Sequence, residues 1–154
     1  KEQFNDYEFV SEMPEIRVKE VRLYDNGSYL AGIEVYYETA NQIVTAGAHC
    51  TVHISDIENP KDWIDYKKSI LKEKKLILDE DEFINCAEIR SGAIVDSILL
   101  KTNKQKSVSA GGTGGDLTKL KFLKGEQLIA FSGSHPSAEN KDETKIKNKN
   151  TFEL

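Results

Sequence analysis

Long apolar runs and positive charge are both scarce in this sequence, and each shortage excludes a class of function. No apolar stretch approaches the roughly 18 residues that a membrane-spanning helix needs, so we expect no membrane span. The 154 residues carry 26 acidic and 21 basic side chains, which gives a net charge of −5. A nucleic-acid-binding surface needs a concentrated positive face, so we expect no nucleic-acid partner.

The residues that most often carry catalysis are also few. There are 3 histidines and 2 cysteines, and no Ser/His/Asp set, Cys/His pair or spaced pair of carboxylates stands out. We therefore expect no enzyme activity. Cys50 and Cys86 would form one disulfide in a secreted protein, or remain two buried thiols, and the sequence leaves both possibilities open.

Three short segments imitate metal or cofactor sites. His49 and His53 would share one face of a strand, with Cys50 on the other face, but a structural zinc site usually takes four ligands. The acidic run at residues 79–82 lacks the spacing of a calcium loop and is typical of a solvated turn. The glycines at residues 111–115 lack the Gly-Lys-Ser/Thr ending of a phosphate-binding loop. We expect neither a metal nor a cofactor.

Strand patterns are abundant. Between residues 76 and 133, short runs of Ile, Val, Leu and Phe alternate with Gly-bearing turns, which predicts an antiparallel all-β fold. Residues 16–24 and 29–37 form the clearest hairpin, joined at Asp25-Asn26-Gly27. The apolar positions of the first strand change phase at Lys19-Glu20, which predicts a β-bulge there. An edge strand is expected over Tyr7–Val10.

Two segments differ in composition from the rest of the chain. Residues 56–75 place a few apolar side chains among dense charges, and Asn59-Pro60 fits a helix start, so we expect a short helical or loop insertion there. Trp63 is expected to anchor this insertion to the core rather than to act as a ligand platform. Residues 141–154 have the composition of a polar, solvated tail, which leaves residues 1–140 as one domain.

The chain also repeats itself weakly. A shift of 65 residues places Gly27, Ile33 and Val35 on Gly92, Ile98 and Leu100, and a shift of 44 residues places Leu78, Glu82 and Ile84 on Phe122, Glu126 and Leu128. These are traces of three related hairpin units. Repeated β units that cannot bury a face alone pack around a shared core.

Four segments in this order resemble the jacalin-related lectins. Leu78–Ile84 is similar to a strand start of that family, Arg90–Asn103 to its Gly, Ile/Val-Asp-x-Ile, Thr-Asn hairpin, and Gly111–Gly115 followed by Gly125–Gly133 to its glycine-rich turn and late strand. The resemblance covers roughly residues 14–140. It implies a β-prism of three antiparallel sheets with pseudo-threefold symmetry, and a carbohydrate-binding module without catalysis.

In that family a Gly-x-x-x-Asp loop near the C-terminus and a glycine-rich turn near the N-terminus hold the sugar. Here Pro136 takes the position of the loop Gly and Asn140 that of the Asp, and the N-terminal glycine-rich turn is missing. Proline removes a donor and an amide is neutral, so the usual site is partly eroded. The residues expected to bind any sugar are Ser134, His135, Ser137, Asn140, Gly111 and Gly112.

The alternative hypothesis is a structural or protein-interaction subunit that keeps the β-prism and binds no sugar. The charged insertion, the polar tail and the altered loop favour it, because partners can add a strand at an open sheet edge. The expected partner is therefore a glycan or glycoprotein, or a protein in an assembly, with a homo-oligomer also open. We expect a secreted or extracellular protein, with an intracellular assembly as the alternative.

Overall fold

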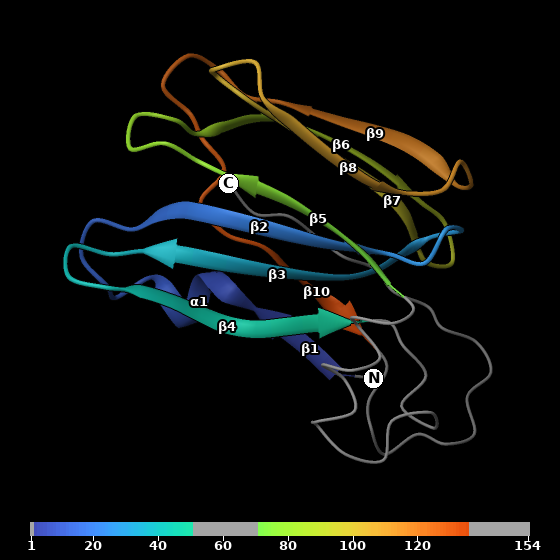
Figure 1. Cartoon of the computed structure of the whole chain (residues 1–154), viewed down its shortest axis with the longest axis horizontal. Helices are drawn as coiled ribbons and strands as arrows, with labels where there is room; N and C mark the ends of the chain where they lie inside the picture. Colours follow the sequence, from blue (N-terminus) through green and yellow to red (C-terminus); the bar gives the residue numbers. More distant parts are fainter. Residues whose placement is uncertain (1, 51–70, 136–154) are drawn as a thin grey trace.

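The computed structural model describes residues 2–50 and 71–135. These residues form three antiparallel sheets, which together make a β-prism (Figure 1). The first sheet pairs β1 (Glu2–Asn5) with β10 (Ser132–His135). The second contains β2 (Arg17–Asp25), β3 (Leu30–Glu38), β4 (Ile43–Cys50) and β5 (Lys72–Ile77). The third contains β6 (Ile84–Ser91), β7 (Val95–Thr102), β8 (Ser107–Gly111) and β9 (Asp116–Lys121). The all-β prediction is confirmed.

The hairpin predicted at residues 16–37 is formed by β2 and β3. Its register shifts between Val18 and Glu20, which confirms the bulge expected at Lys19-Glu20. The turn is held by Asn26, whose Oδ1 accepts from the backbone N–H of Ser28 and of Tyr29, both at 2.9 Å. Short side chains that bond to the following backbone in this way are what make Asx turns stable.

The two four-stranded sheets are copies of one unit. Their strand orders are β4-β3-β2-β5 and β8-β7-β6-β9, so each unit begins on a central strand and ends on an edge. A shift of 65 residues places Leu30 of β3 on Val95 of β7, and a shift of 44 places β5 on β9 from end to end. The change of shift falls between β4 and β5, so the first unit carries its extra residues there.

The turns that precede β6 and β10 share one device. The Glu82 carboxylate accepts from the Asp79 N–H at 3.0 Å, and the Glu126 carboxylate accepts from the Leu123 N–H at 2.9 Å. Glu82 also accepts from the Thr102 hydroxyl at 2.6 Å. Burial raises the pKa of Glu82, but these donors and Lys106 outweigh it, so the pKa is lowered. The acidic run at residues 79–82 is therefore a turn, as predicted.

The core lies where the inner faces of the sheets meet. Val21 and Leu23 of β2, Ile98 and Leu100 of β7, and Phe131 before β10 are all at most 1% exposed. On the outer face of the second sheet, the buried Glu34 carboxylate accepts from the Tyr24 hydroxyl at 3.0 Å and the Tyr36 hydroxyl at 2.5 Å. Buried polar groups of this kind need partners, and here each hydroxyl has one.

The N-terminal segment differs from its prediction. Tyr7–Val10 is not an edge strand: residues Asp6–Val10 form the short helix α1, and the strand precedes it as β1. Asn5 caps the helix through its side-chain oxygen, which accepts from the Tyr7 N–H at 3.1 Å. Asp6 and Val10 are buried four residues apart, which is a helical spacing and not an alternating one.

The insertion ends earlier than predicted. Lys72–Lys75 belong to β5, which pairs with β2 along its whole length, for example Lys74 with Leu23. Charged side chains dominate this strand, and that composition concealed it in the sequence. Residues 56–70, with Asn59, Pro60 and Trp63, lie outside the described part of the chain. Cys50 and Cys86 carry free thiols and are half-buried. No helix in residues 2–50 and 71–135 has the length and hydropathy of a membrane span.

Candidate functional site

The loop predicted to bind sugar begins at the end of β10. Ser134 is buried and pairs with Gln3 of β1, and His135 pairs with Glu2. Ser137 and Asn140 lie outside the described residues. The assignment of these four residues to a sugar site stays a prediction.

A polar cluster anchors the β1–β10 sheet to the second sheet. Asp6 is 1% exposed, and its backbone N–H donates to the Phe131 carbonyl at 2.9 Å. Its carboxylate accepts from the Tyr37 hydroxyl at 2.8 Å and lies 2.8 Å from His49 Nε2. The His49 ring stacks on Phe4, with 3.7 Å between the ring centroids. Burial, and then the charge and hydrogen bond of Asp6, raise the pKa of Tyr37.

This cluster accounts for a residue that resembled a metal ligand in the sequence. His49 is occupied by Asp6 and Phe4, and His53 lies outside the described part of the chain. Within residues 2–50 and 71–135, no group of three His, Cys, Asp or Glu side chains is placed to hold a metal ion.

The glycine-rich turn lies in a different part of the prism. It joins β8 to β9 at the end of the third sheet, beside the β2–β3 turn (Figure 1). The Gly111 N–H donates to Asp25 Oδ2 at 3.2 Å, and the Gly112 N–H donates to the Asp96 carbonyl at 2.9 Å. Gly111 and Gly112 therefore belong to the third sheet, whereas Ser134 and His135 belong to the first. The structure thus divides the predicted residues between two places.

Asp96 is the residue that this turn surrounds. On β6 and β7, Ser91 pairs with Val95 and Arg90 pairs with Ser97, so Asp96 is the extra residue of a β-bulge. Bulges bend a strand locally and redirect a side chain, and they are common next to functional sites. Here the Asp96 carboxylate is directed against the glycines: a Cβ added at Gly114 would lie 2.6 Å from Oδ1, and one at Gly115 2.5 Å from Oδ2.

These contacts explain why the turn needs glycine. Gly115 has φ +69°, and a side chain there would collide with the Asp96 carboxylate as well as with the Ser91 backbone. The turn can therefore come close to the carboxylate only without Cβ atoms. Close approach of backbone to a ligand site is one of the main uses of glycine.

The Asp96 carboxylate has no hydrogen-bond or ion-pair partner among the described residues, although Asp96 is half-buried. The backbone N–H groups of Thr113 and Gly114 in the same turn likewise meet no acceptor in residues 2–50 and 71–135. An ionised carboxylate only accepts hydrogen bonds, and a backbone N–H only donates them. Acceptor and donors side by side suit a ligand rich in hydroxyl groups, because each hydroxyl both donates and accepts.

The first unit of the prism offers an internal comparison. Its β2–β3 hairpin has the same irregularity, between Tyr24 and Asp25, and the extra residue there is Ala31. Ala31 corresponds to Asp96 under the shift of 65 residues. The backbone geometry is repeated, but the carboxylate occurs only in the second unit. A buried alanine in the first unit cannot bind a hydroxyl group.

Sequence reasoning found the glycine turn and missed Asp96. A signal was nevertheless present: Gly92-Ala-Ile-Val-Asp96 has the Gly-x-x-x-Asp spacing of the sugar-binding loop that was expected only near the C-terminus. The aspartate that is lost at Asn140 therefore has a counterpart in the second unit. Its environment depends on the bulge and on the β8–β9 turn, which the spacing alone does not reveal.

Comparison with known proteins agrees with the fold. The family model of the Jacalin-like lectin domain matches residues 3–139. No curated protein matches the chain. Among solved structures, frutalin from Artocarpus incisa in complex with galactose is 16% identical, with a TM-score of 0.65 and full coverage of both chains.

Two further solved structures have the same fold. The galactose-specific lectin of Artocarpus hirsuta, in complex with methyl-α-D-galactose, is 17% identical, with full coverage of both chains and a TM-score of 0.66. The prostate-specific WGA16 glycoprotein lectin is 16% identical, with a TM-score of 0.62 and coverage of 99% of this chain and 87% of that one. The match of the family model over most of the sequence shows that this chain belongs to the Jacalin-like lectin domain family.

Proposed function

We propose that this chain is a non-catalytic carbohydrate-binding module whose main sugar site is formed by Asp96 and the glycine turn at residues 111–115. One observation carries the proposal: a half-buried carboxylate without a partner among the described residues, on a bulge, enclosed by glycines. The family is one of lectins, and two of its solved members hold galactose or methyl-α-D-galactose.

In the proposed complex, the Asp96 carboxylate accepts hydrogen bonds from one or two hydroxyls of a hexose. The N–H groups of Thr113 and Gly114 donate to the hydroxyl oxygens. Gly112, which the sequence already indicated, contributes through the backbone bond that fixes the turn to β7. Because few contacts offset the cost of association, the affinity for one sugar should be about millimolar.

Asp96→Ala should abolish binding of free galactose or mannose, whichever the wild-type chain binds. Hydrogen bonds to a charged group contribute about 1.5–3 kcal/mol, so the loss should be at least about tenfold. Isothermal titration with each sugar, after a glycan array with hapten competition, measures it. Asp116→Ala is the matched control, because it removes the same charge from the exposed start of β9 in the same sheet.

Asn140→Ala separates the two possible positions of the site. If sugar binds at the loop of residues 134–140, this variant loses affinity and Asp96→Ala does not. A blank array from a folded β protein would contradict carbohydrate binding altogether. It would leave the scaffold subunit as the function to test by partner identification.

A further inference from the structure

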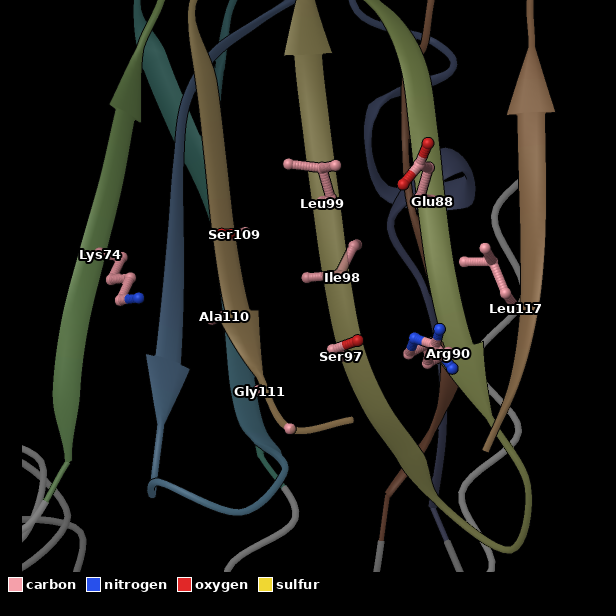
Figure 2. A pocket seen from close by; sticks show the side chains of 11 residues that line it. Lys74, Glu88, Arg90, Ser97, Ile98, Leu99, Ser109, Ala110, Gly111 and Leu117 are labelled. Atoms are coloured by element: carbon pink, nitrogen blue, oxygen red, sulfur yellow. The ribbon is translucent and has the colours of Figure 1, made fainter. Parts of the chain in front are cut away.

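A groove of about 230 Å³ begins at the glycine turn and crosses the third sheet. Figure 2 shows its lining side chains on adjacent strands, from Ser109 on β8 to Leu117 on β9, with Lys74 on β5 beyond β8. It lies on the outer face of the sheet, because Ile98 and Leu100 of β7 point the other way, into the core. Ser97 follows Asp96 directly on β7, so the groove starts where the proposed sugar site ends.

The strand register orders this surface into two rows. Gly111, Ser97, Arg90 and Leu117 are cross-strand neighbours in the first row. Ser109, Leu99, Glu88 and Lys119 form the second row. Each row spans three inter-strand spacings, roughly 14 Å, which is longer than one pyranose ring. Leu99 and Leu117 provide apolar surface between hydroxyl and charged groups, as carbohydrate rings require.

The charge of the groove is opposite to that of the chain. The whole chain carries −5, yet Lys74 and Arg90 line the groove against one acid, Glu88. Glu88 already lies 3.5 Å from Lys119 Nζ. Arg90 Nη1 donates to the Gly115 carbonyl at 3.3 Å, and its other donors meet no acceptor among the described residues. A half-buried guanidinium with a free edge is suited to bind a carboxylate with two hydrogen bonds.

We propose that the groove binds the next residue of an acidic oligosaccharide, a sugar whose carboxylate pairs with Arg90 while the preceding sugar occupies the Asp96 site. This inference rests on the proposed function and adds to it the class of glycan. Arg90 also holds the glycine turn through Gly115, so the same residue connects the two sugar positions. Specificity for acidic glycans then comes from the strand surface and not from the loops.

The test compares disaccharides that differ in one group. Galactose- or mannose-terminated disaccharides with glucose as the second residue are titrated against those with glucuronic acid. The wild-type chain should bind the acidic series about tenfold more tightly, and added salt should weaken only that preference. Arg90→Gln keeps an amide donor for Gly115 but removes the charge, so it should lose the preference and retain the neutral affinity. Lys121→Gln, on the same sheet outside the groove, should retain both.

The outcomes distinguish the two proposals. Equal affinity for the neutral and acidic series, with both lost in Asp96→Ala, would overturn the acidic groove and leave the sugar site standing. A preference that persists in Arg90→Gln would also overturn it, because the charge would then be read elsewhere. Failure of the wild-type chain to bind either series would remove the sugar site and the groove together.

Discussion

Replacing Asp6 with alanine should lower the free energy of unfolding by about 3 kcal/mol. The carboxylate is 1% exposed and bonds to the Tyr37 hydroxyl and His49 Nε2, both at 2.8 Å. Removing one member of a buried polar cluster leaves the others desolvated without a partner, which typically costs 3–5 kcal/mol when an ion pair is broken and less for neutral bonds.

Urea denaturation measures this loss, and thermal unfolding should show a midpoint lower by about 6–12 °C for a chain of this size. Glu8→Ala is the control, since Glu8 is exposed on the same short helix and should change stability little. Asp6→Asn should fall between the two, because an amide still accepts from Tyr37. If Asp6→Ala were as stable as Glu8→Ala, the cluster would not hold the first sheet to the second.

Raising the pH above 10 should destabilise the protein steeply. Burial is the largest cause that raises the pKa of Tyr24 and of Tyr37, followed by the charge of Glu34 and of Asp6 respectively. Burial and a hydrogen bond to Glu34 likewise raise the pKa of Tyr36, to about 12. In the unfolded chain these hydroxyls ionise near pH 10, whereas the folded chain keeps them protonated.

The unfolded state therefore binds fewer protons than the folded state above pH 10, so stability is constant below that pH and falls as pH rises. Two fully buried hydroxyls, those of Tyr24 and Tyr37, give a slope of about 2.7 kcal/mol per pH unit. Urea titrations at pH 8 to 11 measure it. Tyr37→Phe should reduce the slope by about half, whereas Tyr7→Phe, at an exposed position, should leave it unchanged. An unaltered slope in Tyr37→Phe would contradict the assignment.

The architecture followed from the sequence because its signals are local. The bulge at Lys19-Glu20 shows itself as a change of phase in an alternating strand, and the repeat shows itself in the glycines and apolar positions of the two hairpins. The helix at Asp6–Val10 was missed because five residues are too few for a helical period to emerge, and because its burial depends on Tyr37, far along the chain. Lys72–Lys75 were missed because an edge strand may carry charge on either side.

The candidate site was predicted only in part for a similar reason. Gly111 and Gly112 were identified by composition, and the structure encloses Asp96 with their turn. The role of Asp96 depends on a register shift and on a turn about fifteen residues away, neither of which can be read from spacing. Arg90 was part of the family resemblance, but its neighbours Ser97 and Leu117 come from other strands.

The pairing of β1 with β10 has a consequence for how the chain is made. Glu2 is one of the first residues to leave the ribosome, and its partner His135 is among the last of the described ones. The two four-stranded units contain their own hairpins and can form earlier, whereas the first strand must wait for nearly the whole chain. Until then Phe4 and Asp6 can reach His49 and Tyr37 but not Phe131. Closing the prism is thus the last step of synthesis, and a chaperone would find its substrate in a finished pair of sheets with one strand unpaired.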